Sequence, residues 1–442
     1  MSSQWTRREA AHLLRRAGFF ASSEEVENAV ALGRSATVDK LLAGVPLSND
    51  TARSPLPPIE QVQVEGKSLK ADAISDQQLY WIYRMMHTPS PLTEKMALFW
   101  HGHFATSNSK VDGLALMVRQ IELFRTYALG DFKELVRQVG RDPAMMLWLD
   151  ITSNQKGRPN ENYAREVLEL FTLGIGPYTE QDIREGARTF TGWKLDKQAG
   201  KVSFDPKLYD DGTKQVLGEV GRWDAEDTVD IIFRQSALAM FMARKLLRFF
   251  AIDEPPEDWV ERVADRFVSS GYRIGEVLRG IFLADDFYEP RVMSGRVRSP
   301  VEYTLSLLLS LELPLQRGIT VALREMGQEL FLPPDVSGWA GGERWLAASS
   351  LLARSRYAAR MVYMLDEGKL LSPRFLPEQA ATPEAWVRLW TERAGVGELG
   401  AHTLKVLTGY AKKCLAREIP SEAFGLKGLL YLILVSPEAQ LA

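Results

Sequence analysis

The chain has 442 residues, of which 45% are hydrophobic and 25% charged, and this balance excludes global disorder. The net charge of −3 offers no electrostatic footprint for nucleic acid, so we expect no nucleic-acid partner. Cys414 is the single cysteine, which excludes an intramolecular disulfide framework and a multi-thiolate metal site. Because the sequence has no run of about 18 apolar residues, we expect no membrane span. No secretory signal is visible, so we expect a cytoplasmic location for the chain as given.

Apolar residues recur at helical spacing along most of the chain. This pattern predicts an all-α fold, a large multi-helix globular domain with one small inserted β-hairpin. Thr6 and the Ser22 capping box predict the starts of the first two helices, which end at Gly18 and Gly33. We expect an N-terminal helical segment, a Pro-containing surface connection, a central helical core that carries the candidate site, and a C-terminal helical part packed on the same core. Their ranges are 1–45, 46–71, 72–312 and 313–442.

Beyond the connection, helices are predicted near 72–88, 92–100, 112–129, 131–139, 142–150, 160–173, 179–191, 226–250, 257–269, 273–287, 299–311, 317–326, 344–367, 383–394, 400–417 and 422–435. Only Lys201–Val220 has the pattern of extended chain. Asp210-Asp-Gly separates its two apolar stretches and is typical of a hairpin turn. We therefore expect the one β-hairpin near 201–220.

Two of the five histidines, His101 and His103, flank Gly102 in an aromatic stretch that runs from Phe99 to Phe104. Paired imidazoles can bind a transition metal or act as acid and base near neutral pH, and Gly102 allows the bend that brings them together. The alternative is that both rings hydrogen-bond backbone groups at a helix C-terminus. The sequence leaves both interpretations open.

A second candidate lies in the predicted helix between Asn160, its N-cap, and Gly174, its stop. Asn162, Glu166 and Glu169 share one face of this helix, which apolar residues flank. Two carboxylates held close together share a proton, coordinate a cation or pair with arginines. A structural polar network is the alternative. The candidate arginine partners are Arg165, Arg184 and Arg188.

The arginines also have their own interpretations. Arg184 and Arg188 recur four residues apart on the next predicted helix and suit a carboxylate or an anionic ligand. Arg165 is a candidate ligand contact, or else the partner of Glu161 in a surface ion pair at i, i+4 spacing.

A Gly/Pro-rich loop that begins at Pro333 carries two tryptophans, Trp339 and Trp345. Such a loop can line a pocket that stacks on a sugar or another flat ligand. Equally, it can anchor the helix that follows. We take both tryptophans as candidate substrate-binding residues.

The chain lacks the Gly-x-Ser-x-Gly elbow, the Walker loop, the His-Glu-x-x-His motif and the Rossmann glycine fingerprint. Ordinary serine hydrolases, P-loop enzymes and zincins therefore fit poorly. In the motifs that it does carry, the chain resembles the domain of unknown function 1800 family of bacterial proteins. The resemblance runs in order over almost the whole chain, through 99–104, 160–174, 178–193, 245–246, 299–302, 333–342 and 436–440.

The resemblance implies little about chemistry, because the family has no settled activity. Its members are often exported and often encoded beside a phosphatase- or sulfatase-like family, which implies such a partner and work on an envelope or polymer. This chain departs from the family pattern at two places. Tyr209-Asp210 stands where the family typically has His-Asp, and Gln235-Ser236 stands where it has His-Pro. If those histidines belong to the site, this chain lacks them.

Two functional hypotheses follow. The first is a hydrolase-like enzyme in which Glu166 and Glu169 face His101 and His103, and either hold a divalent metal or serve as general acid and base on a glycan or phosphoester. The second is a non-catalytic binding or accessory protein that presents its tryptophans to a polymer or a partner protein. A third interpretation is a structural ion network around the same helix, without a ligand. The oligomeric state stays open.

Overall fold

The computed structural model describes residues 5–47, 56–372, 382–416, 418–419 and 421–442. The fold is 61% helical, and over the described residues it has 23 α-helices and three antiparallel sheets of two strands each. The predicted, predominantly helical class is therefore confirmed. None of the described helices combines the length and the apolar character that crossing a bilayer requires. The division into four stretches stays a prediction.

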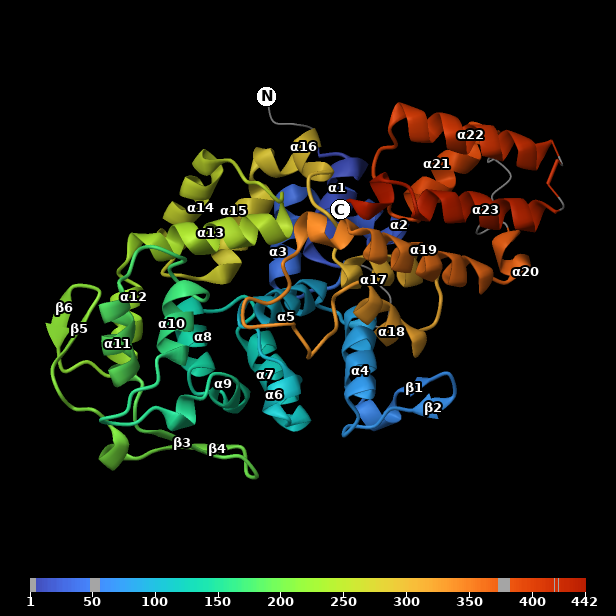
Figure 1. Cartoon of the computed structure of the whole chain (residues 1–442). Helices are drawn as coiled ribbons and strands as arrows, with labels where there is room; N and C mark the ends of the chain where they lie inside the picture. The colour runs from blue at the N-terminus through green and yellow to red at the C-terminus, as the bar shows by residue number, and fades with distance from the viewer. Residues whose placement is uncertain (1–4, 48–55, 373–381, 417, 420) are drawn as a thin grey trace.

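Three helices open the fold: α1 (Arg7–Ala17), α2 (Ser23–Leu32) and α3 (Arg34–Leu42). Capping boxes start the first two, because the hydroxyls of Thr6 and Ser22 each accept a hydrogen bond from the backbone of a glutamate three residues on. Gly18 and Gly33 follow their last residues, as predicted. The first helix lies close to the end of the chain (Figure 1), since Arg16 donates a hydrogen bond to the Ala442 carbonyl at 2.5 Å.

The middle of the molecule is built around one buried helix. Trp100 of α5 (Pro91–His103) and Phe104, which follows this helix, are fully buried, and Trp100 stacks on Phe132 with ring centroids 5.5 Å apart. These rings have no polar atom to satisfy except the indole N–H, which donates to the Ala128 carbonyl. The helices of this part are α4 (Ile74–His87), α5 (Pro91–His103), α6 (Asn108–Val111), α7 (Leu114–Thr126), α8 (Phe132–Val139) and α9 (Pro143–Trp148).

Three more helices and two hairpins form one end of the molecule (Figure 1). The Thr179–Asp182 capping box starts the second of these helices. The elements are α10 (Asn162–Glu169), α11 (Glu180–Thr189), β3 (Trp193–Asp196), β4 (Lys201–Phe204), β5 (Lys214–Val216), β6 (Glu219–Gly221) and α12 (Ala225–Ile232).

The strand pairing corrects the predicted hairpin over 201–220. Lys201–Phe204 pairs with β3, and β5 pairs with β6, so the region carries two hairpins. The turn of the second is Leu217-Gly218, where both residues have positive φ, 49° and 85°, as a type I′ turn requires. Asp210-Asp-Gly makes no such turn, because Arg188 of α11 holds the Asp210 carboxylate from outside the segment.

A third hairpin lies in the predicted surface connection. It joins β1 (Gln63–Val64) to β2 (Lys67–Ser68). Its turn is Glu65-Gly66, where both residues again have positive φ. The part of that connection between 48 and 55 is outside the described residues.

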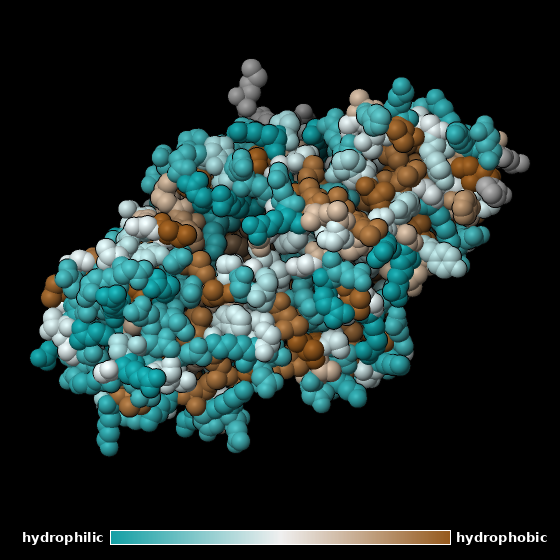
Figure 2. All heavy atoms as spheres, in the orientation of Figure 1, coloured by the Kyte–Doolittle hydropathy of each residue, from teal (hydrophilic) through white to brown (hydrophobic). Residues whose placement is uncertain are grey.

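The remaining helices complete the fold. After α13 (Ser236–Phe250) come α14 (Glu257–Ser269), α15 (Ile274–Leu283), α16 (Pro290–Met293), α17 (Pro300–Ser310) and α18 (Gly318–Glu325). The C-terminal helices are α19 (Ala348–Tyr363), α20 (Glu367–Leu370), α21 (Pro383–Arg393), α22 (Ala401–Leu415) and α23 (Glu422–Leu434). Figure 2 shows a mostly hydrophilic face, with apolar side chains exposed over the C-terminal helices. Leu352, Val406 and Phe424 are exposed apolar residues of these helices.

Candidate functional site

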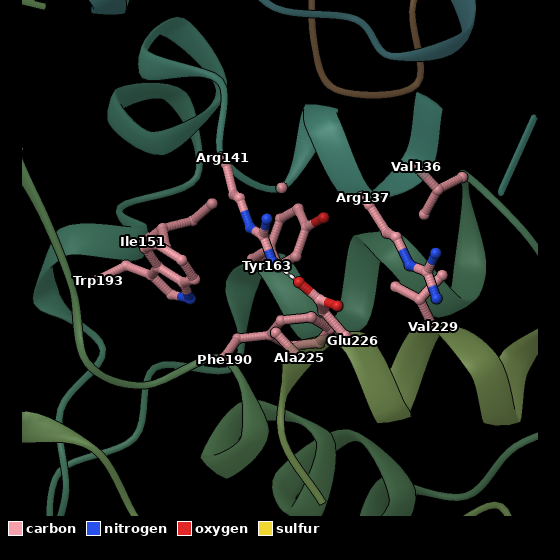
Figure 3. Close-up of a pocket in the computed structure, with 11 residues that line it drawn as sticks. Val136, Arg137, Arg141, Ile151, Tyr163, Phe190, Trp193, Ala225, Glu226 and Val229 are labelled. Carbon is pink, nitrogen blue, oxygen red and sulfur yellow. Dashed lines mark hydrogen bonds and ion pairs between the residues drawn. The ribbon is translucent and has the colours of Figure 1, made fainter. Parts of the chain in front are cut away.

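A pocket opens where α8, α10, β3 and α12 meet, and it encloses about 350 Å³, part of it open to solvent. Figure 3 shows the ion pair of Arg141 and Glu226 at its centre, with Trp193 on one side and Arg137 on the other. The lining residues are Val136, Arg137, Gly140, Arg141, Ile151, Tyr163, Phe190, Trp193, Ala225, Glu226 and Val229.

Tyr163 forms the back of this pocket. Its side chain is buried, and its ring meets the Phe190 ring edge-on at a centroid distance of 4.9 Å. A Cβ at Gly140 would lie 2.6 Å from the Tyr163 hydroxyl oxygen, so the glycine makes room for the hydroxyl. Among the described residues, this hydroxyl has no hydrogen-bond partner. Burial raises the pKa of Tyr163, so the hydroxyl stays protonated and can both donate and accept.

The other polar groups of the pocket are mostly donors. The Arg141 guanidinium lies over the Trp193 ring, 5.0 Å from its centroid, while it pairs with the Glu226 carboxylate. The Nε–H of Arg137 is buried without a hydrogen bond, although its Nη2 pairs with Asp230 at 2.5 Å. The pocket thus combines an aromatic surface, several donors and one carboxylate acceptor.

The carboxylates that the sequence singled out, Glu166 and Glu169 of α10, do not line this pocket. Glu169 accepts a hydrogen bond from the Tyr178 hydroxyl at 2.7 Å. Burial, and after it the charge of Glu169, raises the pKa of Glu166. Asn162 is exposed and lies 3.4 Å from Asp150.

The three candidate arginines bind other carboxylates. Arg165 makes two hydrogen bonds to Glu180, at 3.0 and 2.8 Å, and also contacts Glu161, as the surface alternative predicted. Arg184 is 63% exposed and lies 3.8 Å from Glu161. Arg188 forks onto Asp210 at 2.8 and 3.1 Å and also pairs with Glu185. None of the three arginines forms an ion pair with Glu166 or Glu169. Asn162 and Arg184 are exposed, so the structural network that the sequence suggested is not buried at these two residues.

Both candidate histidines are buried and bound to the backbone. The Nε2 atom of His101 accepts a hydrogen bond from the Phe331 N–H at 3.0 Å, and burial lowers the pKa of His101 to about 3. His103 uses both nitrogens: Nε2 lies 3.0 Å from the Phe171 carbonyl, and Nδ1 lies 3.0 Å from the Lys245 ammonium. His103 thus contacts the segment that follows α10 through the Phe171 carbonyl, and not through Glu166 or Glu169. Both rings bond to backbone groups, as the second interpretation of the histidine motif predicted.

The tryptophan loop packs on the same motif. The Trp339 ring meets the His101 ring edge-on, with centroids 5.2 Å apart. Gly338 has φ +78°, and a Cβ there would lie 2.2 Å from the Gly102 carbonyl oxygen, so the loop backbone is seated against α5. Trp345 is half-buried and closes over Gly341 of the same loop. Neither tryptophan lines the pocket around Tyr163.

In the part of the chain that the structure describes, no three His, Cys, Asp or Glu side chains are grouped to hold a metal ion. A divalent metal held by Glu166 and Glu169 has no support from this grouping and stays a prediction.

The family comparison agrees with the motifs. A family model described as a protein of unknown function, DUF1800, matches residues 12–441. The chain belongs to this family. No curated protein and no solved structure matches it.

Tyr209 and Gln235, the two residues that replace family histidines, each hydrogen-bond to a backbone carbonyl. The Tyr209 hydroxyl donates to the Trp223 carbonyl at 3.2 Å, and its ring lies under the Lys214 ammonium. Gln235 precedes α13 and donates to the Ile231 carbonyl. Each residue therefore makes a local bond of its own in place of the expected histidine.

Sequence reasoning missed the pocket around Tyr163. The tyrosine lies inside a recognised DUF1800 motif, but it shares an apolar face with Val167, which indicates only packing. Arg141 and Glu226 are 85 residues apart and belong to no motif that we identified. The place of Tyr163 in a motif helix was the one available signal.

Proposed function

We propose that this DUF1800 protein binds a saccharide unit in the pocket around Tyr163 and acts there as a binding protein. The observation that supports the proposal is the hydroxyl of buried Tyr163, which has no partner among the described residues, in a pocket that Trp193 and the Arg141–Glu226 pair also line. A pyranose offers C–H faces to an aromatic ring and hydroxyls that donate and accept. An ion pair of arginine and glutamate supplies both kinds of partner without a preference for a charged ligand.

Binding is favoured over hydrolysis by the carboxylates of the pocket. Glycoside hydrolases use two carboxyl groups on either side of the scissile bond. Glu226 is the one carboxylate among the residues that line this pocket, and it is already paired with Arg141. A second group to act as acid or nucleophile is missing from the lining.

Calorimetric titration of the wild type with glucose, galactose, mannose and N-acetylglucosamine tests the proposal. We expect one of these sugars to bind, Tyr163→Phe to weaken it about fivefold, and Trp193→Ala to weaken it more. Tyr209→Phe is the matched control, because its hydroxyl lies outside the lining, and it should bind like the wild type. The proposal fails if no sugar binds at tens of millimolar, or if Tyr163→Phe and Trp193→Ala bind unchanged.

A second candidate function keeps the hydrolase hypothesis, with Glu166 as acid–base group on a glycan or phosphoester. It is supported by the half-buried Glu166 carboxyl, whose pKa is raised beside Glu169. The test is release of nitrophenol from nitrophenyl glycosides and nitrophenyl phosphate, with and without added Mg²⁺ or Zn²⁺. Glu166→Gln should abolish the release and Glu180→Gln, at an exposed ion pair, should not. Equal rates in both variants would discard this candidate.

In an accessory version of the binding role, the saccharide belongs to an envelope or polymer on which a phosphatase- or sulfatase-like partner acts. The family resemblance is the sole support for this partner. Co-purification of the two proteins tests it. The cytoplasmic location of the chain likewise stays a prediction, which fractionation of the native cells would decide.

A further inference from the structure

We propose a second ligand site, for a small organic anion, in the pocket where α1 meets the segment before α17 and the end of α21. This pocket encloses about 280 Å³, part of it open to solvent. Arg15 and Arg298 bring two guanidinium groups to it, and Phe19 and Phe20 form an apolar wall. The site is separate from the pocket around Tyr163 and does not depend on the saccharide proposal.

The first argument comes from the arginines of α1. This helix carries four of them, and three have assigned partners. Arg7 pairs with Glu27 and Glu392, Arg8 pairs with Glu398, and Arg16 donates to two backbone carbonyls. Arg15, although it lies in the same helix, has no hydrogen bond or ion pair among the described residues. A half-buried guanidinium without a partner is a ready site for a carboxylate or phosphate.

The second argument is the charge around Arg298, which is 4% exposed. Its guanidinium donates to the Ser306 hydroxyl and the Gly395 carbonyl, both neutral acceptors. Burial, and after it the charge of Arg15, lowers the pKa of Arg298 to about 9, so the two cations lie near each other. Neither has a carboxylate partner of its own.

Glu302, the one carboxylate side chain in the lining, does not neutralise them, and Ala442, which also lines the pocket, is bound by Arg16. Its Oε1 atom contacts both Lys95 and Arg296, and its Oε2 atom accepts from Arg296 and from the Ser299 N–H. Two cations already balance its single charge. The pocket therefore carries an excess of positive charge, which a bound anion would remove.

The wall of the pocket decides the class of anion. Phe19 is buried and Phe20 is half-buried at the pocket. An inorganic anion would leave the exposed part of Phe20 without a contact, whereas an anion joined to a ring or a short chain would cover it. The geometry therefore favours a carboxylate or phosphate group with an apolar body over a free inorganic ion.

Titration of the full chain with phenyl phosphate, benzoate and inorganic phosphate at low salt tests the site. We expect phenyl phosphate or benzoate to bind and to raise the thermal midpoint of unfolding. Arg15→Gln should weaken this binding about tenfold. Arg244→Gln is the matched control, because Arg244 pairs with exposed Glu257 on another helix and does not line the pocket, and it should bind as the wild type does.

Arg15 is chosen because its removal breaks no hydrogen bond or ion pair within the described chain, so the variant should fold. Arg15→Lys keeps the charge but loses the paired N–H donors of the guanidinium group, and an intermediate affinity would support bidentate recognition of the anion. Preferred binding of benzoate would assign a carboxylate, and preferred binding of phenyl phosphate would assign a phosphate. The site is wrong if none of the three probes binds the wild type, if inorganic phosphate binds most tightly, or if Arg15→Gln binds as tightly as the wild type.

Discussion

The Nδ1 atom of His103 lies 3.0 Å from the ammonium group of Lys245, and this contact joins α5 to α13. Lys245 also donates to the Leu170 carbonyl at 3.3 Å, one residue beyond α10, where a cation is favoured by the helix dipole. Because the lysine donates to Nδ1, the Nε2 atom carries the proton that His103 donates to the Phe171 carbonyl. Both nitrogens of this histidine are thus occupied in holding three helices together, which leaves none for a metal.

Replacement of His101 by phenylalanine should destabilise the protein. The ring would still fill its place beside Trp81 and Trp339, but the buried Phe331 N–H would lose its acceptor. A buried donor left without a partner costs about 1–3 kcal/mol, and urea denaturation should show that loss. His402→Gln, on the exposed face of α22, is the control and should leave the free energy of unfolding unchanged. An equally stable His101→Phe would mean that the hydrogen bond does not hold the Phe331 segment.

Gly338→Ala should be more damaging than an ordinary glycine replacement at positive φ. Its Cβ would lie 2.2 Å from the Gly102 carbonyl oxygen, which belongs to the backbone and cannot turn away. Gly327→Ala is a matched control, because Gly327 has φ +91° and nothing lies within 4 Å of its Cβ. The strain shared by both variants is about 1–2 kcal/mol, and the overlap at Gly338 should add about 1–3 kcal/mol. Equal thermal and urea midpoints for the two variants would contradict the close packing of the loop on α5.

Asp142 should make stability depend on pH. Burial raises the pKa of Asp142 to about 6, from an ordinary value of 3.8, although Met145 and Gln120 donate to it. The folded protein therefore binds more protons than the unfolded chain between about pH 4 and pH 6, and its free energy of unfolding falls as pH rises through that window. The two-unit difference corresponds to about 3 kcal/mol.

Asp142→Asn keeps an acceptor oxygen for Met145 and Gln120 but cannot ionise. We expect it to flatten the pH dependence and to be more stable than the wild type at pH 7. Urea denaturation at several pH values between 4 and 7 measures both effects. A wild type whose stability rises with pH across this window would show that other groups dominate.

Glu302→Gln should be strongly destabilising. The carboxylate is buried and balances Lys95 and Arg296, so its removal leaves two buried cations without a counter-charge. Breaking a buried pair in this way costs about 3–5 kcal/mol. Glu257→Gln, at an ion pair with Arg244 in which the glutamate is 57% exposed, should cost about 1 kcal/mol or less. Comparable losses in the two variants would contradict the role of Glu302 as the centre of a buried ion network.

The helices of this protein could be located from the sequence because their signals are local. Thr6 and Ser22 begin their helices through bonds to a residue three positions on, and Gly18 and Gly33 end them without a distant partner. The helical class and the DUF1800 motifs could be identified from the sequence because they too depend on residues close together in the chain. The turn in 201–220 was misplaced because Asp210 is held by Arg188, which lies 22 residues earlier.

The contacts of the candidate site, in contrast, join residues that are far apart in the sequence. His101 is bonded to a residue 230 positions away, and Arg141 meets Glu226 across 85 positions. Helical spacing states which side chains share a face, but not which other helix covers that face. The sequence by itself thus determined the helical class, the first capping boxes and the family, although the helix predicted over 226–250 is two helices, α12 and α13. Only the tertiary structure decided that the histidines bind backbone, that the arginines bind other carboxylates and that Tyr163 faces a pocket, because those partners come together only when distant helices pack.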